Sequence, residues 1–329
     1  MKILLDENKP FYKANLHCHS TYSDGKFTVE ELKEQYKTQG YSIVAFTDHE
    51  HIIDNSHLND ENFLALTACE IAIKEFPEQS TLKNHNMRVC HLNLYALDQH
   101  NAVTPCYSSI YDHYIKDEIR DKIHHEGEFN RVYTADGINE IIRTAKEKGF
   151  IVCYNHPTWS LENALQYLHY AGLFAVEIYN TSCYRAGARV DDEHVYDDFL
   201  RAGHKLFCVC ADDNHSYASS FGGWVCINAE KLEYGNVMNA LQNGNFYAST
   251  GPEIRSLTQD GVEIEIHTSP CKRIGVTTFG RFAPALVAKD GETLTSARFT
   301  LKPEDKYFRV RVTDENGHVA YTQAYPIEE

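Results

Sequence analysis

Short apolar runs of strand length recur along the N-terminal three quarters of the chain and are separated by stretches with helical periodicity. Because parallel neighbouring strands need a crossover connection, this alternation predicts an α/β fold with a parallel sheet. About seven strand–helix units are enough for a closed or nearly closed barrel. The predicted strands are Ala14–Leu16, Ser42–Phe46, Phe63–Ala68, Arg88–Tyr95, Phe150–Tyr154, Phe174–Ile178 and Lys205–Cys210.

Three helices between these strands have clear start and stop signals. The first opens at Thr28, has Glu31 three residues later as a capping box, and ends at Gly40. The second runs over Thr134–Gly149 with lysines in its last turn, where they complement the helix dipole. The third is expected over Ser160–Gly172.

The pattern changes near Gly251 and Pro252, after which the apolar runs are short and partly alternating. A "DENG" segment at residues 314–317 lies between two such runs and is typical of a hairpin turn. The tail is therefore predicted to form a small all-β, sandwich-like domain. We place the two domains at residues 1–254 and 255–329.

Composition narrows the classes of function. The chain of 329 residues is 43% hydrophobic, and its 47 acidic and 31 basic residues give a formal net charge of -16. Such an excess repels phosphate polymers and argues against a nucleic-acid partner, whereas a small anionic substrate can still be held by a metal. The N-terminus has no signal-peptide pattern, no run is long enough to cross a membrane, and the ten scattered cysteines indicate reduced thiols. A cytoplasmic location is expected.

Candidate chemistry is concentrated on or just after the predicted strands, where barrel enzymes build their sites. Each of the seven strands contributes a histidine or an acidic residue, and gathering these groups would be costly without cations. Imidazole and carboxylate ligands without cysteine favour a multinuclear centre of Zn, Mn or Fe, with Mg also compatible. Glu70 and Asp213 are candidates to bridge two ions. The residues are His17, His19, Asp24, Asp48, His49, Glu70, His91, His156, Glu177, Asp213 and His215.

These motifs resemble those of the PHP superfamily, named for polymerase and histidinol phosphatase. The resemblance runs from Lys13 to Gly251 through "HCHSTYSDG", "TDH", Glu70, "HLNLYAL", "NHP" and "DNH". It implies a distorted (β/α)7 barrel that holds two or three divalent metal ions. The segment "GNFYASTGPEI" and the β tail further resemble the carbaryl-hydrolase-like branch. The implied metal ligands are His17, His19, Asp24, His49, Glu70, His91, His156, Asp213 and His215.

Several assignments have alternatives. His85 competes with His91, although His91 lies in an apolar run, and Asp24 could be a turn residue in "SDG". Asp48 is predicted to orient a neighbouring imidazole. Glu177 is expected to support a ligand or to contact substrate.

Other residues have competing roles of their own. Arg185 and Arg189 could hold an anionic group or pair with the acidic segment that follows them. Asp212 is expected to be structural. Trp159 is expected either to line the pocket or to serve in packing.

Three functions fit the predicted site. The first is a metal-dependent phosphoesterase in which hydroxide activated by the metals attacks a small phosphorylated substrate. The second is a metallohydrolase of a carboxylic or carbamate ester or amide, and the third is a non-catalytic metal-binding module. Several cationic groups around the pocket would favour phosphate, and an apolar pocket would favour a neutral ester. A homo-oligomer is compatible with the sequence.

Overall fold

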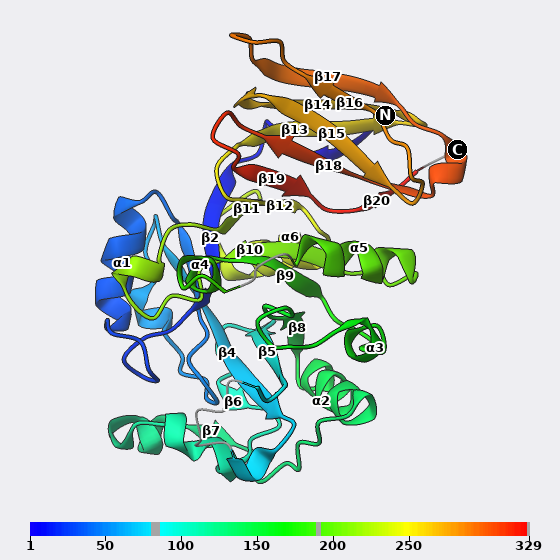
Figure 1. Ribbon diagram of the computed structural model, residues 1–329. Coiled ribbons are helices and arrows are strands. Elements are labelled where there is room, and N and C mark those ends of the chain that lie inside the picture. Colours follow the sequence, from blue (N-terminus) through cyan, green and yellow to red (C-terminus); the bar gives the residue numbers. More distant parts are fainter. Residues whose placement is uncertain (80–85, 189–191, 328–329) are drawn as a thin grey trace.

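The computed structural model describes residues 1–79, 86–188 and 192–327, and it has a mixed α/β fold dominated by one large sheet (Figure 1). All seven predicted strands form and are consecutive neighbours in the order β10-β9-β8-β5-β4-β3-β2. Their bounds are β2 Phe11–Cys18, β3 Ile43–Phe46, β4 Leu64–Lys74, β5 Val89–Ala96, β8 Phe150–Tyr154, β9 Ala175–Asn180 and β10 Phe207–Ala211.

The prediction of a uniformly parallel sheet is wrong at β5. This strand pairs antiparallel with β4 and with β8, whereas the other neighbouring pairs from β2 to β10 are parallel. Because β5 runs against its neighbours, its N-terminal end lies at the same sheet edge as the C-terminal ends of the others. His91, near the start of β5, therefore reaches this edge.

The first and last of these seven strands approach each other without forming a ladder. An isolated parallel bridge joins Cys18 to Asn214. The backbone N–H of Asp213 donates to the His17 carbonyl at 2.9 Å, and that of His19 donates to the Asn214 carbonyl at 3.1 Å. These contacts bring the residues after β2 and β10 together, and full closure of a barrel stays a prediction.

The helices follow the predicted caps in two of three cases. Thr28 and Glu31 form the capping box of α1, Val29–Thr38, and Thr134 caps α2, Ala135–Glu147. The expected helix over Ser160–Gly172 is shorter: α3 spans Ala164–Tyr167 with Asn163 as its cap. The remaining α-helices are α4 Thr181–Arg185, α5 Glu193–Arg201 and α6 Tyr234–Gln242. Short 3-10 helices are η1 Ser56–Leu58, η2 Pro77–Gln79, η3 Ser109–Tyr114, η4 Asp117–Lys122, η5 Tyr217–Ser219 and η6 Pro303–Asp305.

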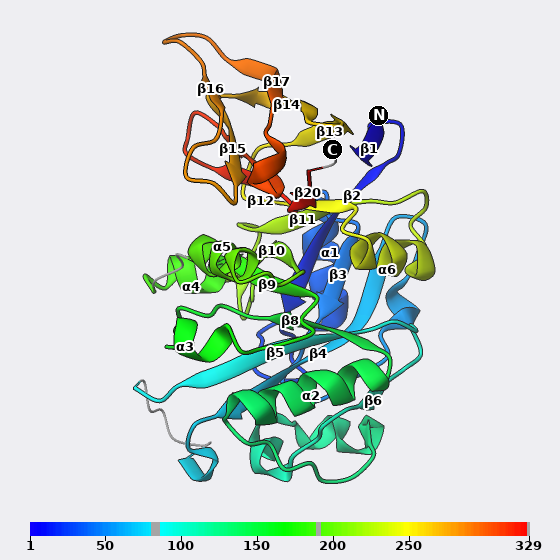
Figure 2. The same cartoon turned by 90° about the vertical axis from the view of Figure 1, so that its right-hand side faces the viewer.

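The C-terminal part is all-β, as its pattern predicts. The "DENG" hairpin joins the antiparallel strands β18 and β19. The strands of this part belong to two sheets, which Figure 2 shows. One apolar cluster draws residues from both sheets, including Leu257, Ile266, Phe299, Phe308 and Val310. The strands are β13 Ile254–Asp260, β14 Glu263–Cys271, β15 Arg273–Thr278, β16 Ala285–Val287, β17 Leu294–Thr300, β18 Tyr307–Thr313, β19 Val319–Thr322 and β20 Tyr325–Pro326.

Two connections cross the expected boundary at residues 254 and 255. The N-terminal strand β1, Lys2–Leu5, pairs with β13. Strands β11, Trp224–Asn228, and β12, Phe246–Ser249, extend the large sheet from β2 to β19. The division into two domains stays a prediction. The two-residue strands β6, Val103–Thr104, and β7, His124–His125, form a separate ladder.

Buried side chains explain the remaining composition. The larger core packs strands β2–β5 and β8–β10 against α2, α5 and α6. All ten cysteines are buried and free. Within the described ranges, no helix has the length and apolar character required to cross a bilayer.

Candidate metal centre

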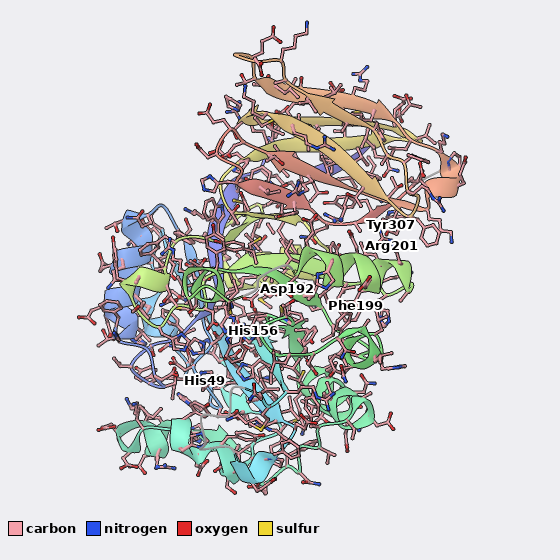
Figure 3. The ribbon with its side chains drawn as sticks, viewed as in Figure 1. His49, His156, Asp192, Phe199, Arg201 and Tyr307 are labelled. Carbon is pink, nitrogen blue, oxygen red and sulfur yellow. The ribbon has the colours of Figure 1, made fainter. Side chains whose placement is uncertain are left out.

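The nine predicted metal ligands converge at the sheet edge formed by the ends of β2, β3, β8 and β10. His17 and His19 flank the end of β2, His49 follows β3, and His156 follows β8. Figure 3 labels His49 and His156, which face a common space from different strands. Eight of the nine belong to three groups whose ligand atoms lie within 4.8 Å of one another, and His91 joins them through Glu70. The groups are His19–Asp24–His49–His215, His17–Glu70–His156 and His17–His19–Asp213.

Glu70 lies at the centre of this cluster. It is 1% exposed and belongs to β4, on the face that points toward the ligands of the neighbouring strands. Five imidazoles approach its carboxylate, so it is placed to serve more than one ion. The ring nitrogens and their distances from a Glu70 oxygen are His49 Nδ1 at 3.1 Å, His91 Nδ1 at 3.1 Å, His17 Nε2 at 3.3 Å, His156 Nε2 at 3.4 Å and His19 Nε2 at 3.5 Å.

Asp213, like Glu70, is a carboxylate surrounded by imidazole nitrogens, and it faces the same nitrogen of His17. Its carboxylate lies 3.0 Å from His19 Nε2, 3.3 Å from His17 Nε2 and 3.7 Å from His215 Nδ1. Asp24, from the loop after β2, lies 3.3 Å from His215 Nε2 and 3.6 Å from His49 Nε2. Each carboxylate therefore faces several imidazole nitrogens, as metal-bridging or metal-terminal acids do.

Further hydrogen bonds orient two of the rings. His17 Nδ1 lies 3.0 Å from a Glu177 oxygen, which leaves Nε2 toward Glu70 and Asp213. His215 Nδ1 lies 3.0 Å from the Asp213 carbonyl, which leaves Nε2 toward Asp24. Metal-ligating imidazoles usually donate their other N–H to such an acceptor, and this fixes the tautomer.

The donor set fits divalent metal ions. His17 Nε2 and both ring nitrogens of His19 are buried without a hydrogen-bond partner. Orphaned polar atoms of this kind are costly, and a cation would satisfy them. Burial and the neighbouring His215 and His49 rings lower the pKa of His19 to about 4, so His19 is neutral and has a lone pair to offer at physiological pH. Imidazole and carboxylate ligands suit Zn, Mn or Fe.

The backbone is strained at this edge. His156 has φ of 29° and Asp213 has φ of 52°, values that side chains with a Cβ rarely adopt. Each lies two residues after the end of a strand, β8 or β10, and belongs to the cluster. Strain of this kind persists where surrounding structure holds a functional geometry in place.

Glu177 supports the cluster from behind. It is 1% exposed, and one oxygen accepts from His17 while the other accepts from the His156 backbone N–H and the Asn180 side chain, each at 3.0 Å. Both of its oxygens are therefore engaged, one with the His17 ring and the other with the segment at His156 and with Asn180.

Asp48 holds a loop instead of an imidazole. Its carboxylate accepts from the backbone N–H and hydroxyl of both Ser20 and Ser23, at 2.7–3.1 Å. These four donors, which lie in the segment between His19 and Asp24, take the place of the histidine contact that the sequence predicts. Asp48 thus shapes the loop that carries these two candidate ligands.

Arg185 makes its contacts away from the cluster. It donates to the carbonyls of Ala218 and Ser220, each at 2.8 Å, because the loop at η5 passes next to α4. Among the described residues it forms no ion pair with the acidic segment or with a candidate ligand. Arg189 and His85 lie outside the described residues. Asp212 is structural as predicted, and accepts from Tyr36, Thr181 and three backbone N–H groups of residues 221–223.

Several residues around the cluster are absent from the sequence prediction. Asn155 donates to Glu70 at 2.8 Å, and Asn180 donates to Asp213 at 3.1 Å. Asn155 directly precedes His156 in "NHP", which is the only signal that could have identified it. Trp159 is 46% exposed, and its ring lies 4.9 Å from that of His156, so it lines the mouth of the site.

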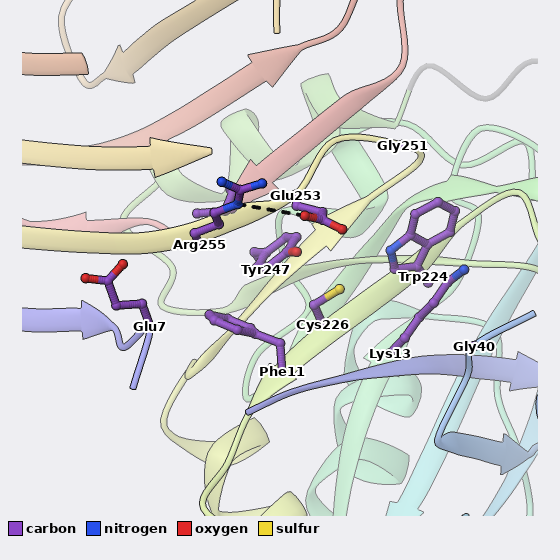
Figure 4. Close-up of a pocket in the computed structure, with 11 residues that line it drawn as sticks. Glu7, Phe11, Lys13, Gly40, Trp224, Cys226, Tyr247, Gly251, Glu253 and Arg255 are labelled. Atoms are coloured by element: carbon purple, nitrogen blue, oxygen red, sulfur yellow. Dashed lines mark ion pairs between the residues drawn. The ribbon is translucent and has the colours of Figure 1, made fainter. Parts of the chain in front are cut away.

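The segment "GNFYASTGPEI" lies elsewhere. Tyr247, Gly251 and Glu253 line a pocket of about 620 Å³ together with Lys13 and Trp224 (Figure 4). Lys13 belongs to the start of β2, whereas the candidate ligands follow its end. This segment is therefore part of the junction with the β tail, and not of the cluster.

Comparison with known proteins gives one family match. Residues 15–171 match the family described as PHP domain. A 37-residue segment is 49% identical to the DNA polymerase/3'-5' exonuclease PolX of Bacillus subtilis, and this segment is 11% of the chain and 6% of that protein. The match therefore spans a small part of the polymerase.

Two solved structures are similar to this chain at low sequence identity. A two-domain protein from Bacteroides vulgatus, which contains a predicted PHP-like metal-dependent phosphoesterase, is 14% identical with a TM-score of 0.48, over 98% of this chain and 96% of that one. A proposed metal-dependent phosphoesterase from Bifidobacterium adolescentis is 17% identical with a TM-score of 0.39, over 64% of this chain and 90% of that one. These likenesses concern the chain path only.

Proposed function

We propose that this protein is a PHP-superfamily hydrolase, a metal-dependent phosphoesterase that acts on a small phosphorylated compound. One observation carries the proposal: two buried carboxylates, Glu70 and Asp213, are surrounded by imidazoles, and three of the ring nitrogens, on His17 and His19, have no hydrogen-bond partner. The match of residues 15–171 to the PHP domain family supports it. The proposal includes a distorted (β/α)7 barrel at residues 1–254, a sandwich-like β domain at residues 255–329 and a cytoplasmic location.

The three ligand groups suggest a trinuclear centre. One ion would be held by His19, Asp24, His49 and His215, and a second by one of the two groups that contain His17, because His17 has only Nε2 to offer an ion. The remaining residues of the other group would hold the third ion. Glu70 and Asp213 would bridge, because each faces ring nitrogens of more than one group. His91 would complete the ion next to Glu70 and His156. Zn, Mn or Fe suits this donor set.

Bound divalent ions would supply a water of lowered pKa and would neutralise the charge of the phosphoryl group. The protein's own residues supply the geometry. Glu177 fixes the His17 ring, Asp48 fixes the loop of His19 and Asp24, and Asn155 holds one oxygen of Glu70. Four of the candidate ligands are thus held by a second residue before substrate binds, which limits reorganisation during the reaction.

The surroundings of the cluster provide one cation and two aromatic faces. The Lys74 ammonium lies 5.5 Å from the centre of the Tyr114 ring, and this ring lies 4.6 Å from that of His49. Lys74 shares a face of β4 with Glu70, because alternate residues of a strand point to the same side. We assign Lys74 to the charge of a phosphoryl group and Trp159 to the organic part of the substrate.

Trp159 also supports a second candidate, the hydrolysis of a carboxylic or carbamate ester or amide. Its exposed ring beside His91 and His156 could bind an uncharged group as well as a phosphate ester. Lys74 would then contribute little to turnover. The two candidates differ in how strongly turnover depends on this lysine.

The test compares p-nitrophenyl phosphate with p-nitrophenyl acetate on the protein loaded with Mn or Zn. We expect phosphate ester hydrolysis, its loss on chelation, and its recovery when the metal is restored. Lys74→Met should raise KM for the phosphate more than it changes acetate hydrolysis, with Lys116→Met as the matched control on an exposed lysine. Hydrolysis of acetate alone would favour the second candidate, and hydrolysis that survives chelation would exclude both.

A further inference from the structure

A hollow of about 540 Å³ lies at the seam between α5, the start of β10 and the β tail. It is separate from the candidate metal centre and shares none of its ligands. Figure 3 labels Arg201, at the end of α5, and Tyr307, at the start of β18, next to each other at this seam. Its volume is in the range of small-molecule sites.

The hollow has an apolar floor and a positively charged rim. Phe207, Phe279 and Tyr307 provide rings, and Leu206 and Pro326 add aliphatic surface. The charged residues that line it are Arg201, Lys205 and Lys306, and the described lining contains no acid. A cationic rim of this kind stands out on a chain with a formal net charge of -16.

The acidic residues of α5 that lie one turn before Arg201 are engaged elsewhere. On α5, Asp197 lies four residues before Arg201, but it binds Arg309 at 2.8 Å. Asp198, three residues before Arg201, accepts from the Tyr167 hydroxyl at 2.7 Å. Arg201 consequently makes no salt bridge within the described ranges, although its helix is acidic.

Two further cations of the rim are placed around the apolar floor. The Lys306 ammonium lies 3.8 Å from the centre of the Phe279 ring, so it is held over the mouth by a cation–π contact. Lys205 is exposed, and within the described part of the chain it has no salt-bridge partner. A second hollow of about 340 Å³ shares Lys205 and Phe207 and adds Lys146. The two hollows therefore adjoin at Lys205 and Phe207.

We infer that this seam binds a small amphipathic anion: an organic molecule with an apolar body and one carboxylate, sulfonate or phosphate group. The body would lie on Phe207, Phe279 and Tyr307, and the anionic group would pair with Arg201 and Lys205. Charge complementarity selects an anion over a neutral or cationic molecule of the same body. Because the ligand would contact α5 and the tail together, it would stabilise their junction.

The test uses decanoate, 1-decanol and decyltrimethylammonium, which share an apolar chain and differ in charge. Each is titrated by calorimetry into the metal-loaded protein in millimolar inorganic phosphate, which occupies anion sites at the metals. We expect one decanoate site, with a Kd about tenfold or more below those of the other two probes. We also expect a rise in Tm on decanoate binding. Equal affinity for all three probes, or displacement of decanoate by added phosphate, would overturn the inference.

Variants locate the site. Arg201→Glu with Lys205→Glu should weaken decanoate binding about tenfold or more, whereas Lys231→Glu with Lys289→Glu makes the same change of charge elsewhere and should leave it within about twofold. If the first pair fails to fold, Arg201→Gln with Lys205→Gln replaces it. Phe279→Trp adds an indole at the rim, and its emission should change on titration. Native affinity in the charge-reversed or neutralised pair, or an unchanged indole signal, contradicts this assignment.

Discussion

Two buried glutamates show how the same side chain serves different purposes in this molecule. Glu70 is 1% exposed and Glu162 is 8% exposed. Three hydroxyls donate to Glu162, from Tyr133 at 2.7 Å and from Tyr154 and Tyr170 at 2.5 Å. Glu70 instead faces five imidazoles that also face one another.

Their pKa values move in opposite directions. Burial raises the pKa of Glu162 above its ordinary value, and its tyrosine donors offset only part of this effect. Burial would do the same at Glu70, but the His91, His17 and His156 rings hold the pKa of Glu70 well below its ordinary value. Hydrogen bonds from neutral donors satisfy the carboxyl group of Glu162 without any bound ion. The carboxylate of Glu70 stays ionised among imidazoles and can therefore bind cations.

The largest expected effect comes from neutralising the first of these glutamates. Glu70→Gln removes a bridging charge, so metal content should fall and phosphate ester hydrolysis should drop on the order of 10²–10³-fold. Metal analysis by mass spectrometry and kcat/KM measure the two effects. Glu162→Gln is the matched control, and it should retain metal and activity. Equal losses in both variants would mean that Glu70 is a structural residue like Glu162.

A smaller loss is expected at the residue that orients His17. In Glu177→Gln, the amide cannot accept from His17 and also accept from the His156 N–H and Asn180, because one of its ends is now a donor. Metal affinity should fall about 10–100-fold, as it does when such supporting carboxylates are altered. Titration against a competing chelator measures this change. Unaltered affinity would remove Glu177 from the positioning role.

The third prediction concerns the stability of the fold and not the binding of metal. Glu162→Gln puts an amide NH₂ among three hydroxyls that now need acceptors, and the free energy of unfolding should fall by about 1–3 kcal/mol. Urea unfolding of the metal-free protein measures it, because bound metal would add its own stabilisation. Tyr217→Phe, which changes an exposed tyrosine, should leave stability within about 0.5 kcal/mol. A stability unaffected by Glu162→Gln would show that the tyrosine cluster contributes little.

Much of the candidate site is readable from the sequence because histidines and acids follow apolar runs at seven places. Periodicity identifies a strand but not its direction, so the sequence could not show that β5 runs antiparallel. His91 was assigned from its position in an apolar run, and the reversed strand explains why it reaches the ligand edge from near the start of β5.

Other features were beyond sequence reasoning for physical reasons. The roles of Asp48 and Asn155 depend on donors and acceptors that are close in space but distant along the chain. The pairing of β1 with β13 joins the N-terminal strand to one that lies far along the chain, and no local pattern encodes it. The third helix is short because the residues directly after His156 form a loop instead of its first turns. In this loop the Ser160 hydroxyl approaches the His156 ring.

The smallest expected effect is a pH dependence of the free energy of unfolding that comes from Asp192. Like Glu162, Asp192 is a buried carboxyl group whose pKa is raised by burial. Asp192 is buried and accepts from the backbone N–H and hydroxyl of Thr158, and burial raises its pKa from 3.8 to about 6. The folded state therefore binds this proton more tightly than the unfolded state, so the contribution of Asp192 to stability is full below about pH 4 and is lost as pH rises to 6. Asp192→Asn removes the titration, and its stability relative to the native protein should increase across this window and then stay constant. Urea unfolding of both metal-free proteins at pH 4, 5, 6 and 7 measures the difference. A difference that stays flat or falls with pH would show that Asp192 is ionised in the fold, as Glu70 is.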